Sequence, residues 1–162
     1  MNKVYILTGG NMGDREANLA NAAALIDKKI GRIVNRSFIY QTAAWGNEDQ
    51  PDFLNQVLEI ATIQHPKKVL KTLMEIEKGM GRSRKLKNDP RPIDLDILFY
   101  ENLVQRDEVL ELPHPRIQLR RFVLVPLAEI APDLVHPVLG KTIIELLEIC
   151  EDPLEVSIYN LQ

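Results

Sequence analysis

Two aspartates on one predicted strand have a type and spacing that could support chemistry. Asp94 and Asp96 lie in "NDPRPIDLDILFY", residues 88–100. Aspartate is depleted in strands, and an unpaired buried carboxylate is costly. Because side chains alternate along a strand, both acids are expected on one side, roughly 6.6 Å apart along the chain. The residues expected on the opposite side are Ile93, Leu95, Ile97 and Phe99.

Carboxylates at this spacing can converge on one metal ion or bridge two. Oxygen ligands suit Mg²⁺, which keeps several waters and takes its remaining ligands from substrate phosphates. Two such ions would neutralise a polyphosphate and hold the attacking and leaving oxygens in line. A bare Asp-x-Asp pair is more often the solvent face of a one-sided sheet, so the surrounding residues decide the interpretation.

Basic residues flank the acid pair on both sides. Arg82, Arg84 and Arg91 precede it along the chain. The segment "PHPRIQLRRF" follows it and is expected to form a second cationic cluster of His114, Arg116, Arg120 and Arg121. The planar guanidinium group of arginine matches phosphate oxygens. Two acids between two basic clusters indicate a nucleotide-triphosphate site with its metal.

The secondary structure that must position these residues is expected to contain both strands and helices. Expected strands cover residues 3–9, 32–42, 53–63 and 92–100, with helices after Asp14 and from Pro66. Two further helices follow at 120–132 and 141–150, the first broken or kinked near Pro126. This β-α-β-β-α-β order is that of a ferredoxin-like α+β sandwich. We expect a mainly antiparallel sheet with helices covering one face.

Composition and charge limit the class of protein. The 162 residues fit one domain spanning 1–162, and the 45% hydrophobic and 27% charged fractions are ordinary for a globular protein. A net charge of −3 argues against a nucleic-acid partner, and no stretch is apolar enough for a membrane span. One cysteine, Cys150, fits a reducing cytosol, so we expect a cytoplasmic location. No obligate protein partner is evident.

Five separated segments, in order, resemble the 6-hydroxymethyl-7,8-dihydropterin pyrophosphokinase family of folate biosynthesis. They are "TGGNMGDREANL", "YQTAAWGNEDQPDFLN", "IEKGMGRSR", "PRPIDLDILFY" and "PHPRIQLRRFVLVPLAEIAP". The resemblance implies the ferredoxin-like fold. It also implies transfer of pyrophosphate from MgATP to the hydroxymethyl oxygen of the pterin, with release of AMP.

The resemblance also implies residue roles. The expected catalytic residues are Arg82, Arg91, Asp94 and Asp96, with the two acids binding two Mg²⁺ ions. ATP would contact Arg82, Arg84, Arg91, Ile97, His114 and Arg120. The pterin would contact Thr42, Ala43, Ala44, Trp45, Phe53, Asn55 and Phe122. Asn55 would hydrogen-bond the pterin edge and the two phenylalanines would sandwich its ring, while loops 43–52 and 82–91 close over the site.

Two other functions are compatible with parts of this pattern. A metal-dependent nucleotidyltransferase also uses an acid pair on a strand, but it would transfer AMP and release pyrophosphate. A non-catalytic ferredoxin-like module would bind a ligand without turnover, and it has no need for an acid pair beside arginines. Analysis of the products separates the first from a pyrophosphokinase, and a failure to bind MgATP would favour the second.

Overall fold

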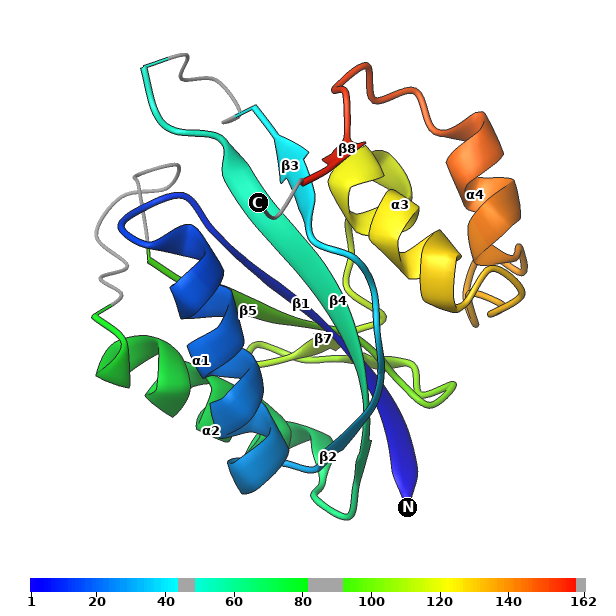
Figure 1. Cartoon of the computed structure of the whole chain (residues 1–162). Coiled ribbons are helices and arrows are strands. Elements are labelled where there is room, and N and C mark those ends of the chain that lie inside the picture. The colour runs from blue at the N-terminus through cyan, green and yellow to red at the C-terminus, as the bar shows by residue number, and fades with distance from the viewer. Residues whose placement is uncertain (44–48, 82–91, 160–162) are drawn as a thin grey trace.

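An antiparallel sheet forms the centre of the molecule. The computed structural model describes residues 1–43, 49–81 and 92–159. The sheet order is β5-β1-β4-β3-β8, with β2 also paired to β4 (Figure 1). Its strands are β1 (Asn2–Gly10), β2 (Arg32–Arg36), β3 (Tyr40–Thr42), β4 (Phe53–Thr62), β5 (Asp94–Tyr100) and β8 (Ser157–Ile158). Strands β6 (Gln105–Arg106) and β7 (Glu111–Leu112) form a separate pair.

The helices are α1 (Arg15–Lys29), α2 (Pro66–Gly79), α3 (Arg121–Ile130) and α4 (Ile143–Ile149), with a short 3₁₀ helix η1 (Ile117–Leu119). With β2 and β3 counted as the one strand predicted at residues 32–42, the order is the predicted β-α-β-β-α-β, followed by additional helices, so the ferredoxin-like α+β fold is confirmed. Within the described part of the chain, no helix has the length and apolar character needed to cross a membrane.

Local signals in the sequence account for the starts of α1 and α2. The Asp14 carboxylate accepts a hydrogen bond from the Ala17 N–H at 3.1 Å and caps α1. Pro66 is the first residue of α2, where its missing N–H costs nothing. Helix α3 is continuous through Pro126, so of the two predicted alternatives, a break or a kink, the break is wrong. The residues around Pro126, including Leu124 and Leu127, are buried in the core, and this packing holds both turns together.

The single strand predicted at residues 32–42 is two strands in the structure. Strands β2 and β3 both pair with β4, and Ser37 lies between them. The Ser37 N–H donates to the Val57 carbonyl at 2.9 Å, and its hydroxyl accepts from the Val57 N–H at 3.0 Å. Because a side-chain oxygen takes the place of a backbone acceptor, the regular ladder is interrupted at this residue.

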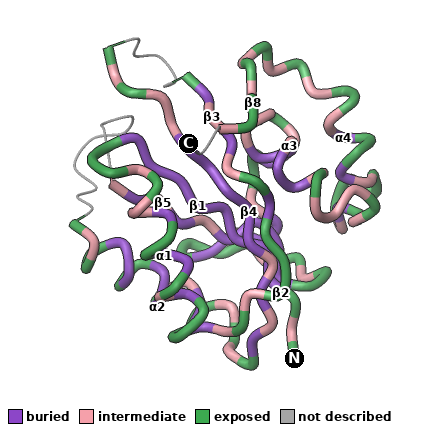
Figure 2. Tube along the Cα trace, viewed as in Figure 1, coloured by how far each residue is buried: buried purple, intermediate pink, exposed green. Residues whose placement is uncertain are grey.

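Helices cover both faces of the sheet, not the single predicted face. Helices α1 and α2 pack on one face, over buried residues that include Val4 and Ile60. Helices α3 and α4 pack on the opposite face, over residues that include Val57 and Phe99 (Figures 1 and 2). The prediction of a single helical layer was wrong because side chains on the second face, including Leu7 and Val57, are apolar and buried with α3 and α4. Part of the second face stays uncovered and carries the cavity described below.

A β-bulge in β5 reverses the side-chain alternation after the acid pair. Tyr5 pairs with Phe99 while Ile6 pairs with Ile97, so Leu98 is an extra residue on β5. Phe99 therefore packs with α3 and α4, whereas Ile97 packs with α1 and α2. The prediction that Phe99 shares a side with Ile97 was wrong, because the extra residue shifts the phase by one.

Candidate active site

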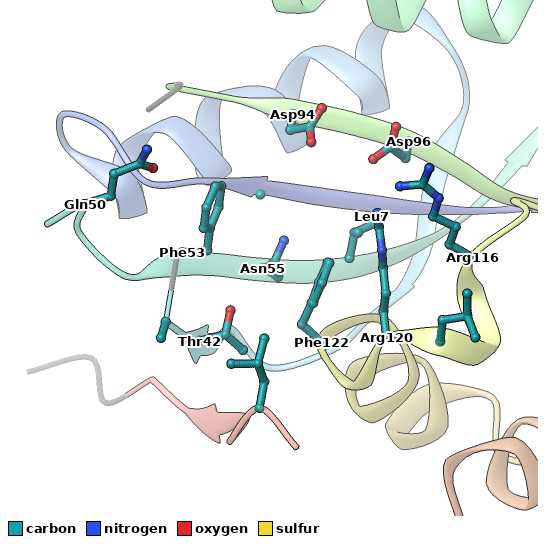
Figure 3. Close-up of a pocket in the computed structure, with 14 residues that line it drawn as sticks. Leu7, Thr42, Gln50, Phe53, Asn55, Asp94, Asp96, Arg116, Arg120 and Phe122 are labelled. Atoms are coloured by element: carbon teal, nitrogen blue, oxygen red, sulfur yellow. The ribbon is translucent and has the colours of Figure 1, made fainter. Parts of the chain in front are cut away.

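A cavity of about 510 Å³ lies over the uncovered part of the second sheet face. Four strands, η1, α3 and the C-terminal segment contribute to its wall (Figure 3). The lining residues are Leu7, Gly9, Thr42, Ala43, Gln50, Phe53, Asn55, Asp94, Asp96, Arg116, Leu119, Arg120, Phe122 and Leu154. Eight of them are residues whose site role the sequence predicted: Thr42, Ala43, Phe53, Asn55, Asp94, Asp96, Arg120 and Phe122.

The strand register fixes the spacing of the polar groups on the cavity floor. Gly9 of β1 is paired with Asn55 of β4 on one side and with Asp94 of β5 on the other. Two strand spacings, about 10 Å, therefore separate the backbones at Asn55 and Asp94. Asp96, two residues after Asp94 on β5, is paired with Leu7 of β1. On the cavity floor, β4 therefore carries the Asn55 amide. The two carboxylates lie on β5, which is separated from β4 by β1.

The amide end of the cavity depends on a close approach between two strands. Asn55 is 5% exposed, and its Nδ2 donates to the Thr8 carbonyl at 3.3 Å. A Cβ atom at Gly9 would lie 2.1 Å from that nitrogen. Only glycine leaves room for the Asn55 side chain in this position. The hydrogen bond and the contact together fix the direction of the amide.

Aromatic rings lie on either side of Asn55. Figure 3 shows Phe53, from the start of β4, and Phe122, from the start of α3, flanking the amide. The Arg120 guanidinium lies over the Phe122 ring, 5.5 Å from its centre. Thr42 pairs with Phe53 across β3 and β4 and closes this end. Such an arrangement can hold a flat ring between apolar faces while an amide hydrogen-bonds its rim.

The other end of the cavity combines acids with arginines. Asp94 and Asp96 are both half-buried on β5, on the same face, as predicted. In Figure 3 the Arg116 and Arg120 side chains extend toward Asp96. Across the described residues, no group of three or more His, Cys, Asp or Glu side chains could hold a metal. An ion held by the two carboxylates would therefore need water or substrate oxygens as well, which fits Mg²⁺.

His114 lies beside this end but does not belong to a cationic cluster. Burial, followed by the nearby charges of Arg120 and Arg116, lowers the His114 pKa to about 4. The ring is therefore neutral at neutral pH, and the prediction that it adds positive charge was wrong. Its Nδ1 accepts from the Arg116 N–H at 3.2 Å, so the neutral ring carries its hydrogen on Nε2.

Ile97 cannot present its side chain to a ligand, because that side chain is 4% exposed and packs in the core under α1 and α2. The backbone of β5 can still present hydrogen-bonding groups outside the sheet, because β5 is the edge strand. The Leu95 N–H on this edge donates to the buried Glu77 carboxylate at 2.8 Å. Ile97, two residues on, points its backbone groups to the same edge.

Beyond that edge, α2 and the β6–β7 turn line a second groove of about 560 Å³. Its apolar lining comes from Leu70, Met74 and Val109, and the other lining residues are Lys67, Lys71, Glu75, Glu77 and Lys78. Five residues whose roles were predicted lie outside the described residues: Ala44, Trp45, Arg82, Arg84 and Arg91.

Residues 5–132 match the family model of 7,8-dihydro-6-hydroxymethylpterin-pyrophosphokinase. The chain belongs to this family. A relative from Methylorubrum extorquens, named 2-amino-4-hydroxy-6-hydroxymethyldihydropteridine pyrophosphokinase, is 45% identical over 91% of this chain and 92% of its own length. A relative of the same name from Bacillus subtilis is 44% identical over 80% of this chain and 78% of its own. The resemblance drawn from the sequence is confirmed.

Longer proteins match this chain over part of their own length. The folic acid synthesis protein fol1 of Pneumocystis carinii is 40% identical over 90% of this chain, which spans 20% of that protein. A solved Plasmodium falciparum HPPK-DHPS structure with pteroate superposes with a TM-score of 0.72 at 17% identity, covering 91% of this chain and 42% of that one. At that identity the likeness supports the fold alone.

Several residues that line the cavity had no individual ligand contact predicted from the sequence, and Arg116 was expected only as a member of the second cationic cluster. Arg116 lines the cavity, whereas Arg121, from the same basic run, has its backbone N–H bonded to the Asp152 carboxylate and does not line it. Gly9 was predicted only as the last residue of the strand at 3–9, although "TGGN" belongs to the resembling segment. Leu154 had no local signal, because its place depends on how the end of the chain folds back.

Proposed function

We propose that this chain transfers the pyrophosphoryl group of ATP to the hydroxymethyl oxygen of 6-hydroxymethyl-7,8-dihydropterin, giving AMP and the pterin diphosphate. One observation carries the proposal beyond family membership. A single cavity has an amide between two aromatic rings at one end and a carboxylate pair facing arginines at the other. A flat, polar-edged acceptor and a polyphosphate donor need these two environments side by side.

The pterin is assigned to the end formed by Phe53, Asn55 and Phe122. The aromatic rings supply apolar faces for the pterin ring, and the Asn55 amide supplies a donor and an acceptor for its rim. Thr42 and Ala43 border the same end. Ala44 and Trp45 are included in this part of the proposal on the resemblance alone.

The triphosphate is assigned to the end formed by Asp94, Asp96, Arg116 and Arg120. The two carboxylates would hold Mg²⁺, and we propose two ions, which would supply charge neutralisation to the phosphate oxygens. The arginines at the cavity wall would bind phosphate oxygens and stabilise the negative charge that develops on them during transfer. Arg82, Arg84 and Arg91 belong to the proposal as the residues of a closing loop, with Arg82 and Arg91 in catalytic roles.

His114 contributes as a neutral ring rather than as a cation. With its hydrogen on Nε2, it can donate one hydrogen bond to a phosphate oxygen without adding charge. Its Nδ1 bond to the Arg116 backbone fixes the ring beside the arginine. This geometry supports the predicted contact between His114 and ATP in a form that depends little on pH above the His114 pKa.

The nucleoside of ATP is assigned to the groove between α2 and the β6–β7 turn. Leu70 and Met74 offer an apolar surface to a base, and β5 offers the backbone of Ile97 at the sheet edge. ATP would then cross the edge of β5, with its phosphates reaching the acids on the second face. In this form the predicted role of Ile97 requires only its backbone.

Transfer requires mainly positioning and charge neutralisation. The hydroxymethyl oxygen forms a bond to the β-phosphorus as the bond from that phosphorus to the α,β-bridging oxygen breaks. AMP keeps the bridging oxygen, and the hydroxyl proton is released to water. Asn55 and the two aromatic rings hold the acceptor, while the arginines hold the donor in line. We propose that residues 1–162 act as one domain on these small molecules, in the cytoplasm.

Incubation of the protein with MgATP and the hydroxymethyl dihydropterin tests the function directly. Stoichiometric AMP and pterin diphosphate are expected. Release of pyrophosphate with a pterin adenylate would instead identify a nucleotidyltransferase. Failure of the protein to bind MgATP would instead favour a non-catalytic module. The matched control is a double variant, Asp94→Asn with Asp96→Asn, which keeps side-chain volume and removes both charges.

A further inference from the structure

The C-terminal segment, residues 151–159, reaches back to the cavity from beyond the part of the chain that matches the family model, residues 5–132. Leu154 of this segment lines the cavity together with Thr42 and Phe122. The side chain is neither fully buried nor fully exposed. Leu154 therefore presents an apolar surface to the same end of the cavity as the aromatic rings.

The first half of the segment is tied to the start of α3. The Asp152 carboxylate accepts from the Arg121 N–H at 3.0 Å, at the end of the helix where backbone donors lack helical partners. The same carboxylate accepts from the Leu154 N–H at 3.0 Å. Asp152 thus sets the position of Leu154 relative to Phe122, which lies one residue after Arg121.

The second half is tied to the opposite side of the cavity. Strand β8 pairs with β3, with Ser157 opposite Gln41. The Tyr159 N–H donates to the Ile39 carbonyl at 2.8 Å, and its hydroxyl donates to the Glu16 carboxylate at 2.7 Å. The segment is therefore held at both ends, by α3 on one side and by β3 and α1 on the other.

Arg15 connects this anchor to the cavity. Its guanidinium lies over the Tyr159 ring, 5.7 Å from the ring centre. The same group donates to the Asp52 carbonyl at 2.8 Å, next to the cavity residue Phe53. Tyr159 and Phe53 are thus linked through one arginine, so movement of the C-terminal anchor would affect the aromatic end of the cavity.

We infer that the C-terminal segment is part of the pterin site, with Leu154 as a specificity-determining wall and Tyr159 as the residue that positions it. This inference rests on the proposed function, because it assigns the pterin to the aromatic end. Leu154 limits the space beside the ring and excludes water from its edge. Tyr159 does not contact the ligand, and acts by holding β8 against β3.

Titration calorimetry on the full chain tests the wall. The dihydropterin is titrated in the presence of an α,β-methylene analogue of MgATP, which cannot transfer its pyrophosphoryl group, and the analogue is titrated separately. Leu154→Ala is expected to weaken pterin binding roughly fivefold to tenfold, from lost apolar contact, with binding of the analogue unchanged. Leu154→Phe should also weaken pterin binding, because the larger ring fills the space. The control is Leu139→Ala, at a leucine that is 40% exposed and does not line the cavity.

The anchor is tested in steady-state kinetics with Tyr159→Ala, and with Tyr159→Phe, which keeps the ring over Arg15. The alanine variant should raise KM for the pterin severalfold and leave KM for MgATP unchanged, while the phenylalanine variant should recover most of the loss. In the Leu154→Ala background, Tyr159→Ala should add little, because both changes disrupt the same wall.

The outcomes separate this inference from the proposed function. If the wild type transfers pyrophosphate but both Leu154 variants bind pterin normally, the wall is refuted and the function stands. Equal weakening of pterin and nucleotide binding would show that the segment serves only general stability, which also refutes the inference. A wild type that neither binds nor converts the pterin would overturn both.

Discussion

Gly9 and Asn55 face each other across β1 and β4, and the Asn55 amide occupies the space that a side chain at position 9 would need. Gly9→Ala is therefore expected to displace Asn55 and to weaken pterin binding at least tenfold, since a Cβ would meet Nδ2 at 2.1 Å. Calorimetry with the dihydropterin measures the effect. The control is Gly79→Ala, where a Cβ meets nothing within 4 Å. Equal pterin affinity in the two variants would show that the close approach does not matter.

Asn55→Ala tests the amide itself. Because the variant leaves the pterin edge without its hydrogen-bond partner in a buried site, the binding free energy of the pterin should fall by roughly 1–3 kcal/mol. Binding of MgATP should change little, because Asn55 lies two strand spacings from Asp94. Calorimetry with each ligand separately gives both values. Loss of nucleotide binding to the same extent would place the pterin elsewhere.

Asp94→Asn and Asp96→Asn should each fold normally and lose activity by roughly 100-fold or more, the range for removal of one preorganised electrostatic group. Each change keeps the side-chain volume and removes a charge that would hold Mg²⁺. AMP formation at increasing Mg²⁺ measures the loss, with exposed Asp133→Asn as the control. Near-normal turnover of either site variant at saturating Mg²⁺ would exclude a metal-binding role for that residue.

The two arginines of the cavity should behave differently from their neighbour in the sequence. Arg116→Ala and Arg120→Ala are expected to weaken MgATP binding by roughly tenfold to a hundredfold each, because a charge-assisted hydrogen bond contributes roughly 1.5–3 kcal/mol. Arg121→Ala should be close to wild type, since Arg121 does not line the cavity. Titration of the three variants with the MgATP analogue makes the comparison. An Arg121 effect as large as the others would mean that the whole basic run acts together.

His114 should make the folded state sensitive to mild acid. Burial, followed by the charges of nearby arginines, lowers the His114 pKa from the ordinary histidine value of 6.5 to about 4. Between these pH values the unfolded chain binds a proton that the folded chain does not, so this part of the stability is lost as the pH falls from 6.5 to 4. Urea unfolding of the wild type and of His114→Gln, from pH 4 to pH 7.5, isolates the contribution. The difference between them should grow toward neutral pH, and a constant difference would contradict the assignment.

Local sequence signals were sufficient for most of the fold. The cap at Asp14 and the proline at position 66 placed the helix starts, because these signals act within one turn of the chain. The alternation in residues 93–97 placed Asp94 and Asp96 on one face, and the register confirms that face. The other site residues were predicted from the family resemblance. Of the predicted site residues that the structure describes, all but His114 and Ile97 line the cavity.

Tertiary structure alone decided the features that depend on distant partners. The bulge at Leu98 reverses the direction of Phe99, and no local pattern marks it, because it reflects the fit of β5 against β1. The charge of His114 follows from burial next to two arginines, which composition cannot show. Leu154 reaches the pterin end of the cavity through contacts of the segment around it with α3, β3 and α1, far away in the sequence. Residue types and spacing determine what chemistry is available, whereas burial and long-range pairing determine which of those groups meet.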